Sequence, residues 1–135
     1  MAETAVMKSI DEISGIVVAT AIAIHRDLGP GLLESVYEVV LAGRLEDAGL
    51  KVARQVPVPL TLDGRHFDVA FRIDILVEDR LILEIKAVEQ LSKAHTRQML
   101  TYLRLFRQPL GLLLNFSGAT MKEGIRRIVN DYRPE

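Results

Sequence analysis

The sequence predicts an α/β fold in which helices flank a mixed central β-sheet. Two helix-length apolar patterns come first in the 135-residue chain, three strand-like segments follow, and a helix, a strand and a helix end it. Strands joined by short turns form an antiparallel meander, whereas a strand, a helix and a further strand form a parallel crossover. We therefore expect both kinds of pairing in one sheet. The length fits one domain spanning residues 1–135.

Two helices are predicted at the start of the chain. The first extends from about residue 5 to residue 26, and the Gly29-Pro30-Gly31 turn ends this segment. Apolar residues also lie off its main stripe, so we expect this helix to be buried or to lie at an interface. The second extends from about residue 32 to residue 48, with Gly49 as its C-terminal stop. The main stripe of the first helix consists of Ile13, Ile16, Val17, Thr20 and Ile24.

Three strands are predicted in the middle of the chain from their apolar patterns. They cover residues 55–62, 67–77 and 80–87, joined by turns at Asp63-Gly64 and Glu78-Asp79. Two prolines in the first strand favour the edge of the sheet, because proline cannot donate a ladder hydrogen bond. The remaining predicted elements are a helix at residues 93–106, a strand at residues 110–116 and a final helix at residues 121–132.

The composition excludes several classes of protein. The chain has no cysteine, which excludes disulfides, zinc–thiolate sites and thiol catalysis. Its net charge of −1 gives no basic field of the kind that coats nucleic acid. The apolar run at residues 16–24 is too short to span a membrane and the N-terminus has no signal-peptide layout, so we expect a cytoplasmic protein. The positive mean hydropathy leaves apolar surface for a partner chain and favours a homo-oligomer.

Charged residues stand on one face of two predicted strands. Side chains alternate between the faces of a strand, so Glu84 and Lys86 share a face of the strand at residues 80–87. Asp74 occupies the corresponding face of the preceding strand, and the short turn between the strands makes Asp74 and Glu84 neighbours. Burying such charges costs free energy unless they are paired or bind a metal ion, so their presence on an otherwise apolar strand suggests a function. The residues expected on the opposite, core-facing side are Ile73, Ile75, Val77, Leu81, Leu83 and Ile85.

The two carboxylates need a compensating charge. Two unit charges about 4 Å apart repel by about 4 kcal/mol at an effective dielectric constant of roughly 20. Lys86 or a bound divalent cation can offset this repulsion, and hard oxygen ligands favour Mg²⁺ or Mn²⁺. The alternative reading is a cross-strand salt bridge on a solvated face.

Further polar residues have a placement that suits the same site. Glu34 lies in the first turn of the second predicted helix, where the positive end of the helix also favours a carboxylate. Gln98 and Tyr102 share a face of the helix at residues 93–106, with His95 one turn earlier. The alternative reading of these residues is the polar stripe of an amphipathic helix.

The segment Gly31-Leu32-Leu33-Glu34-Ser35-Val36-Tyr37 matches the motif that names the bacterial GxxExxY proteins, which are assigned to the PD-(D/E)xK nuclease superfamily. The chain resembles this family from about Ile16 to Asn130. Each motif is too short to identify a family by itself, whereas the whole set in this order is specific for the family. The other matching segments are residues 73–78, 83–88, 95, 98, 102–103, 114–116 and 124–128.

The resemblance implies a PD-(D/E)xK nuclease-like core of the RecB-like branch and metal-dependent phosphodiester hydrolysis. Asp74 matches the motif aspartate, and Glu84 and Lys86 match the E-x-K pair. Glu34 matches the helix glutamate of that branch, although Ile73 replaces the proline that often precedes the aspartate. Gln98 and Tyr102 match its Q-x-x-x-Y motif.

These correspondences also imply roles for the residues. Asp74 and Glu84, with Glu34 and the backbone carbonyl of Ile85, would hold one Mg²⁺ or Mn²⁺ ion. Lys86 would orient the attacking water and stabilise developing negative charge. Gln98 and Tyr102 would position the phosphate or Lys86.

Four basic residues on or just after the helix at residues 93–106 are candidate phosphate contacts, although solvated surface charge explains them equally well: Lys93, Arg97, Arg104 and Arg107. We expect nucleic acid as the partner, with DNA favoured over RNA, and no membrane. Three other functions stay open: a catalytically inactive oligomeric scaffold with a nuclease fold, a nucleic-acid-binding accessory subunit, and hydrolysis of a small nucleotide or phosphodiester.

Overall fold

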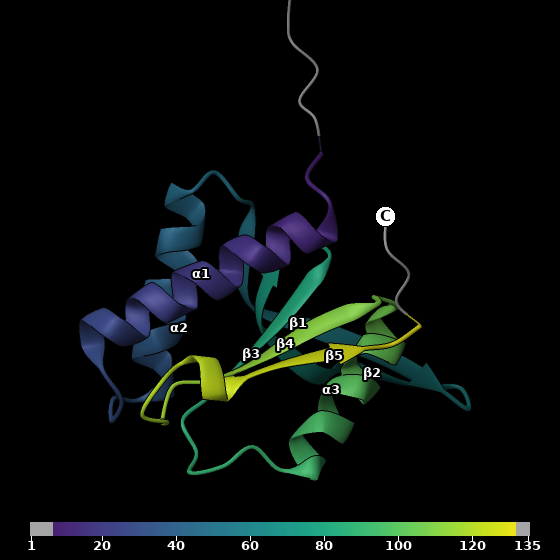
Figure 1. Ribbon diagram of the computed structural model, residues 1–135. Helices are drawn as coiled ribbons and strands as arrows, with labels where there is room; N and C mark the ends of the chain where they lie inside the picture. Colours follow the sequence, from purple (N-terminus) through teal and green to yellow (C-terminus); the bar gives the residue numbers. More distant parts are fainter. Residues whose placement is uncertain (1–6, 132–135) are drawn as a thin grey trace, which may run out of the picture.

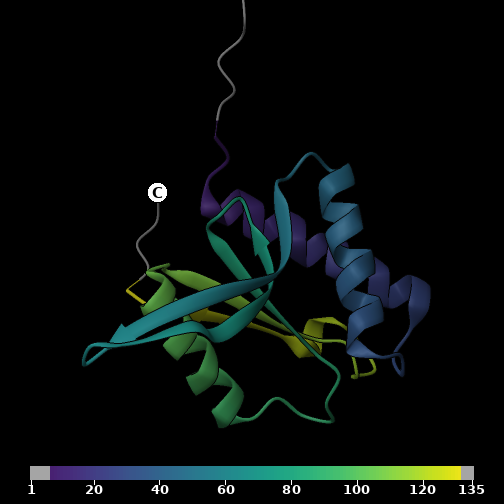
Figure 2. The same ribbon diagram turned by 180° about the vertical axis from the view of Figure 1, so that it is seen from behind.

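A computed structural model describes residues 7–131 of the chain. Five strands form one sheet in the order β1-β2-β3-β4-β5, in which β3 and β4 are parallel and the other neighbours are antiparallel. Helices α1 and α2 cover one face of the sheet and α3 covers the other (Figures 1 and 2). The elements are α1 (Ile10–Leu28), α2 (Glu34–Asp47), β1 (Val52–Leu62), β2 (Arg65–Val77), β3 (Leu81–Lys86), α3 (Lys93–Phe106), β4 (Leu110–Asn115), the 3₁₀ turn η1 (Lys122–Gly124) and β5 (Ile125–Val129). The predicted α/β fold with a mixed sheet is confirmed.

Two apolar clusters hold the helices to the sheet. Leu81, Leu83 and Ile85 of β3 belong to the cluster beneath α1 and α2, as the alternation of this strand predicted. Ile82 belongs to the cluster beneath α3. The expected facing of Ile73 was wrong, because this residue packs in the cluster beneath α3. Burial of both clusters removes apolar surface from water and fixes which face of the sheet carries the polar residues.

The first helix starts later than expected. It begins at Ile10, where the side chain of Ser9 caps it by accepting a hydrogen bond from the Glu12 N–H, and it ends at Leu28. The expected start near residue 5 lies outside the described residues. No helix in the described part of the chain has both the length and the apolar character needed to cross a membrane.

The predicted hairpin turn between β1 and β2 is confirmed. Asp63 and Gly64 both have positive φ angles, 51° and 72°, as the type I′ turn of a two-residue hairpin requires. The strand β1 lies at the edge of the sheet, in agreement with its prolines. The outer part of this hairpin extends away from the body of the molecule (Figures 1 and 2).

The expected final helix at residues 121–132 was wrong. A short 3₁₀ turn at Lys122–Gly124 leads instead into β5, which pairs with β4 from Leu114↔Ile125 to Leu110↔Val129. Every residue of β4 is buried, so an unpaired β4 edge would leave backbone polar groups without partners. The pairing requirement of β4 therefore outweighed the helical spacing of the C-terminal apolar residues. The last predicted residue, Tyr132, lies outside the described residues.

Candidate active site

The acidic centre forms where the backbone ladder between β2 and β3 ends. The last backbone pair is Ile75↔Leu83, and beyond it each strand's carboxylate bonds to the other strand's backbone. The Asp74 N–H donates to Glu84 Oε1 at 3.3 Å, and the Ile85 N–H donates to Asp74 Oδ2 at 2.9 Å. The predicted pairing of Asp74 with Glu84 is thus what the structure shows.

Burial and mutual repulsion act strongly on this carboxylate pair. Burial, followed by the charge of Asp74, raises the pKa of Glu84 to about 8. Burial also raises the pKa of Asp74, although the hydrogen bond from Ile85 opposes this shift. Glu84 is 5 % exposed and Asp74 is half-buried. The pair therefore retains a proton near neutral pH unless a cation replaces it.

Lys86 and Tyr102 complete the polar face beneath α3. Lys86 is half-buried at the end of β3, and its positive charge lowers the pKa of both Asp74 and Glu84. Burial and the charges of the two carboxylates raise the pKa of Tyr102, so its hydroxyl keeps its proton. The Tyr102 ring stacks on Phe71 of β2 with 4.0 Å between ring centroids, which fixes the side chain against the sheet.

Glu34 reaches the same end of the sheet from α2. It is the first residue of the helix, and its Oε2 accepts a hydrogen bond of 3.0 Å from the backbone N–H of Ala87, directly after β3. The Glu34 carboxylate therefore lies beside the backbone of the residue that directly follows Lys86. It does not join Asp74 and Glu84 in one cluster: within residues 7–131 no group of three or more His, Cys, Asp or Glu side chains is placed to hold a metal ion.

Tyr37 fixes the turn that precedes Glu34. Its hydroxyl donates to the Gly29 carbonyl at 2.6 Å and accepts from the Leu32 N–H at 3.2 Å. Its ring is fully buried and stacks on Phe116 with 4.4 Å between centroids. Tyr37 therefore fixes the turn that contains Gly31 and, with it, the start of α2, where Glu34 lies.

The polar residues of α3 have separate surroundings. Gln98 is exposed one turn before Tyr102. His95 forms the capping box at the start of the helix, where its Nδ1 accepts from the Ser92 N–H at 3.0 Å and its own N–H donates to Ser92 Oγ at 3.4 Å. The side chain of His95 therefore caps the start of α3.

The chemistry of the donor set fits a divalent cation. Asp74 and Glu84 offer adjacent hard oxygen donors, and burial raises the pKa of both, which makes it costly for the metal-free pair to carry its full negative charge. A bound cation lowers the pKa of its ligands and removes this cost. The residues present therefore fit Mg²⁺ or Mn²⁺ at the carboxylate pair.

One buried carboxylate near the site escaped the sequence analysis. Glu38 is 6 % exposed and accepts hydrogen bonds from Arg54 and Gln55 of β1. Its charge contributes to the raised pKa of Asp74, which places it close to the acidic centre. The available signal was its position four residues after Glu34, next to the buried Tyr37 in an apolar stripe.

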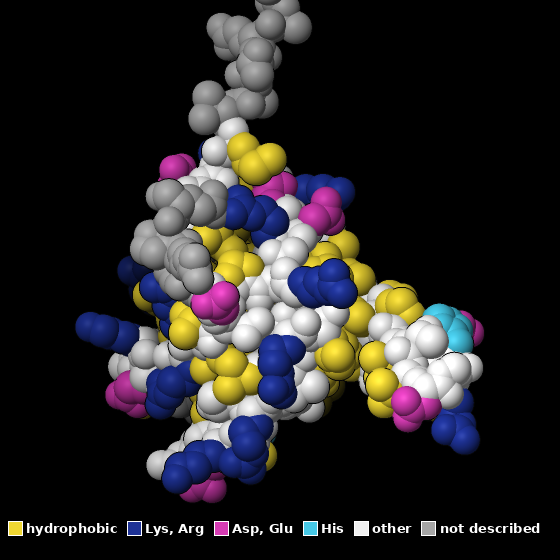
Figure 3. Space-filling view, turned by 90° about the vertical axis from the view of Figure 1, so that its right-hand side faces the viewer, with side chains coloured by type: hydrophobic (Ala, Val, Ile, Leu, Met, Phe, Trp, Pro, Cys, Tyr) yellow, Lys and Arg dark blue, Asp and Glu magenta, His cyan; other side chains and the backbone are white. Residues whose placement is uncertain are grey.

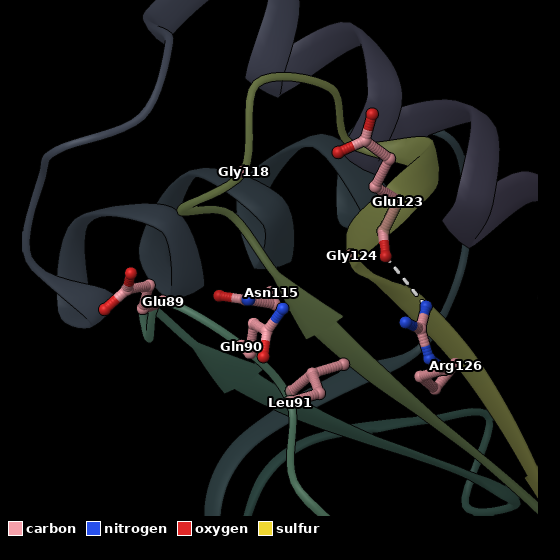
Figure 4. A pocket seen from close by; sticks show the side chains of 8 residues that line it. All are labelled: Glu89, Gln90, Leu91, Asn115, Gly118, Glu123, Gly124 and Arg126. Carbon is pink, nitrogen blue, oxygen red and sulfur yellow. Dashed lines mark hydrogen bonds between the residues drawn. The ribbon is translucent and has the colours of Figure 1, made fainter.

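A hollow of about 420 Å³ lies beside the site at the ends of β3 and β4 (Figure 4). Asn115, which pairs with Lys86 in the sheet, forms its floor and is 4 % exposed. The Asn115 side chain accepts from the Val88 N–H at 3.0 Å and donates to the Val88 carbonyl at 2.9 Å. These bonds hold the connection from β3 to α3. The lining residues are Glu89, Gln90, Leu91, Asn115, Gly118, Glu123, Gly124 and Arg126.

Basic residues gather on the exposed side of α3. No acidic residue occurs between Glu89 and Glu123, and the four basic residues predicted as phosphate contacts are all exposed. Arg97 and Arg104 line one hollow of about 310 Å³ together with Asn130. Lys and Arg side chains are spread over the body of the molecule in the view of Figure 3, beside the projecting β1–β2 hairpin.

The sequence model of one family, described as the PD-(D/E)XK nuclease superfamily, matches residues 11–128. This range contains all the candidate site residues named above. No curated protein and no solved structure matches the chain.

Proposed function

Because the chain belongs to the PD-(D/E)XK nuclease superfamily, we propose that it is a metal-dependent nuclease whose centre is the Asp74–Glu84 pair with Lys86. The observation that carries this proposal is the pair of adjacent carboxylates at the end of the β2–β3 ladder, of which Glu84 is buried and Asp74 half-buried. Burial and the charge of Asp74 raise the pKa of Glu84 to about 8 even though the charge of Lys86 lowers it, so Lys86 does not fully compensate the carboxylate pair.

Asp74 and Glu84 would hold one Mg²⁺ or Mn²⁺ ion, with the backbone carbonyl of Ile85 and the nearby Glu34 as further oxygen donors. When bound, the ion supplies Lewis-acid polarisation of the phosphate and a more acidic water. Hydrolysis forms a bond between the water oxygen and phosphorus and breaks one phosphorus–oxygen ester bond. The attacking water loses a proton, and the leaving oxygen gains one.

The chain's own residues orient this reaction. Lys86 donates hydrogen bonds to the attacking water or a phosphate oxygen and stabilises the developing negative charge. The protonated hydroxyl of Tyr102 donates to a phosphate oxygen, since its raised pKa keeps the proton in place. Gln98, on the same side of α3, positions the phosphate or Lys86.

The substrate in this proposal is nucleic acid, with DNA favoured over RNA. The run without acidic residues from Gln90 to Lys122 supports a phosphate-binding surface in a chain whose net charge is only −1. The GxxExxY segment at residues 31–37 and the Q-x-x-x-Y spacing of Gln98 and Tyr102 support placement in the GxxExxY family and the RecB-like branch.

The exposed apolar residues of α2 and the preceding turn support self-association. Leu33, Val36 and Val39 are 74 %, 39 % and 52 % exposed. Analytical ultracentrifugation of the wild-type chain tests this part of the proposal. A monomer at micromolar concentration contradicts it.

Cleavage assays test the nuclease activity. Purified protein is incubated with single-stranded DNA, double-stranded DNA and RNA in Mn²⁺ or Mg²⁺, beside an EDTA control and the Lys86→Ala variant. The expected result is metal-dependent cleavage of DNA that the variant lacks. No cleavage of any substrate, or equal cleavage by Lys86→Ala, contradicts the proposal and favours the scaffold or accessory-subunit functions.

A further inference from the structure

We propose that Glu38 is a positioning residue of the active site, which sets the spacing between Glu34 on α2 and Asp74 on β2 through bonds to β1. The inference rests on the proposed function, because it concerns the placement of the same acidic groups. None of the family motifs that identify the site includes this glutamate.

Glu38 is the most heavily bonded carboxylate near the site. Its Oε2 accepts from Arg54 Nε at 3.0 Å and from Arg54 Nη2 at 2.6 Å, while its Oε1 accepts from Gln55 Nε2 at 2.9 Å. The Glu38 side chain is 7 % exposed, whereas that of Arg54 is 40 % exposed. A buried carboxylate that has three charge-assisted or amide donors holds a fixed geometry.

The bonds join α2 to β1, and β1 in turn pairs with β2, which carries Asp74. Glu38 lies one helical turn after Glu34, so both project from the same side of α2. Arg54 and Val56 of β1 pair with Ile75 and Ile73 of β2, which places Gln55 across from Asp74. The Glu38–Gln55 bond therefore ties the helix of Glu34 to the strand position beside Asp74.

The backbone of Gln55 is strained at the residue that makes this bond. Its φ angle is +52°, a left-handed conformation that costs a non-glycine residue of order 1–2 kcal/mol. Among the described residues it is the one non-glycine residue with positive φ inside a strand. Ordinary strand geometry would remove the strain, so its presence indicates that the direction of the Gln55 side chain matters to the site.

The charge of Glu38 adds to this role. It acts on Asp74 as a nearby negative charge, although Arg54 pairs with it. Glu38 therefore both fixes the frame of the site and increases its attraction for a cation. Groups that hydrogen-bond a metal ligand directly are worth about 10–100-fold in metal affinity or activity. Glu38 acts one contact further away, through Arg54 and Gln55, so we expect an effect at the lower end of this range.

The test compares Glu38→Gln and Gln55→Gly with a matched control on the same helix. Arg44→Ala breaks the 2.9 Å ion pair between α2 and Asp27 of α1, away from the acidic centre. Mn²⁺ affinity is measured by titration calorimetry on protein shown to be folded by circular dichroism, and kcat and KM are measured on DNA. Gln55→Gly is informative because glycine relieves the strained backbone while removing the donor to Glu38.

We expect about tenfold weaker Mn²⁺ binding in Glu38→Gln and Gln55→Gly, a lower kcat with unchanged KM, and wild-type values in Arg44→Ala. Gln55→Gly should keep the wild-type melting temperature, which separates positioning from a purely structural role. Wild-type Mn²⁺ affinity in either folded variant overturns the inference and leaves the nuclease proposal intact. Absence of Mn²⁺ binding and cleavage in the wild-type chain overturns both.

Discussion

Asp74 and Glu84 face each other where β2 and β3 stop pairing through their backbones, and the Asp74 N–H donates to Glu84 Oε1 at 3.3 Å. The Glu84 carboxylate satisfies the backbone N–H of Asp74, and the Asp74 carboxylate satisfies that of Ile85. Within the described residues, neither carboxylate forms an ion pair with a cationic side chain. Two oxygen donors in fixed positions, with only the charge of Lys86 to offset their own, suit a divalent cation.

Lys86→Ala should abolish cleavage without unfolding the chain. The side chain is half-buried at the end of β3, and it supplies positive charge to both carboxylates. We expect at least about 100-fold loss in kcat, the usual effect of removing a group that stabilises transition-state charge. Rates from single-turnover cleavage and melting curves of both proteins check this. Full activity in Lys86→Ala or in Asp74→Ala would show that the centre is assigned to the wrong residues.

The metal-free protein should lose stability as the pH rises from about 4.5 to about 8. Unfolded Glu84 releases its proton near its ordinary pKa of 4.5, whereas folded Glu84 releases it near 8. Between these values the folded state binds more protons than the unfolded state, so stability is present below pH 4.5 and is lost as the pH rises through 8. The total contribution is on the order of a few kcal/mol.

Melting temperatures in EDTA across this pH range measure the effect, with Glu84→Gln as the control that lacks the titrating group. The wild-type curve should fall relative to that of the variant. Saturating Mn²⁺ should remove the fall, because the cation replaces the proton on the carboxylate pair. Parallel curves in EDTA would contradict the raised pKa of Glu84.

Tyr37→Phe should lower stability, whereas Tyr102→Phe should lower the cleavage rate. The Tyr37 hydroxyl is buried and makes two backbone hydrogen bonds, so its removal should cost about 1–3 kcal/mol of stability. The Tyr102 hydroxyl makes no such bond within residues 7–131, and its removal should lower kcat with little change in stability. Urea unfolding and cleavage rates of both variants distinguish the two roles. Equal loss of stability in both would show that Tyr102 is structural.

The placement of several candidate site residues could be predicted because it depends on single elements. The alternation of β3 alone places Glu84 and Lys86 on the face opposite Leu83, and α3 was predicted with the bounds that the structure has. Glu38 could not be predicted in this way. A glutamate on a helix resembles a solvated residue, and its partners Arg54 and Gln55 become neighbours only when α2 packs on β1.

The C-terminal strand shows a second reason for failure. Ile125, Ile128 and Val129 have a spacing that suits a helix as well as a short strand. The choice depends on the unpaired edge of β4, which lies elsewhere in the sequence and requires hydrogen-bond partners. Local periodicity contains no information about that edge.

Arg97→Ala and Arg104→Ala should weaken substrate binding in a salt-dependent manner. Both side chains are exposed and line one hollow on α3, on a segment without acidic residues. Each phosphate contact that is lost should lower the slope of log K against log salt by about one unit. Fluorescence anisotropy with labelled DNA in Ca²⁺, with Arg44→Ala as the control, measures these slopes. Unchanged slopes in both variants would move the substrate path to another face.

Gly124→Ala and Gly43→Ala should change stability in opposite directions. A Cβ at Gly124 would overlap the backbone oxygen of Asn115, a position that side-chain movement cannot relieve. We expect a cost of about 1–3 kcal/mol or more from this overpacking. The change also displaces Asn115, which holds the connection after Lys86 through its bonds to Val88, so the cleavage rate should fall as well.

Gly43 is the matched control, because it lies exposed inside α2. Apart from the backbone of its own helix and its chain neighbours, no atom of the described residues lies within 4 Å of a Cβ at this position. Alanine at this position should stabilise the helix by about 0.5–1 kcal/mol and leave cleavage unchanged. Urea unfolding of the two variants, with cleavage measured on the same preparations, gives both values. If Gly124→Ala unfolded at the wild-type urea concentration, the close approach of η1 to the end of β4 would be wrong, and with it the assignment of Asn115 as the residue that fixes this edge of the site.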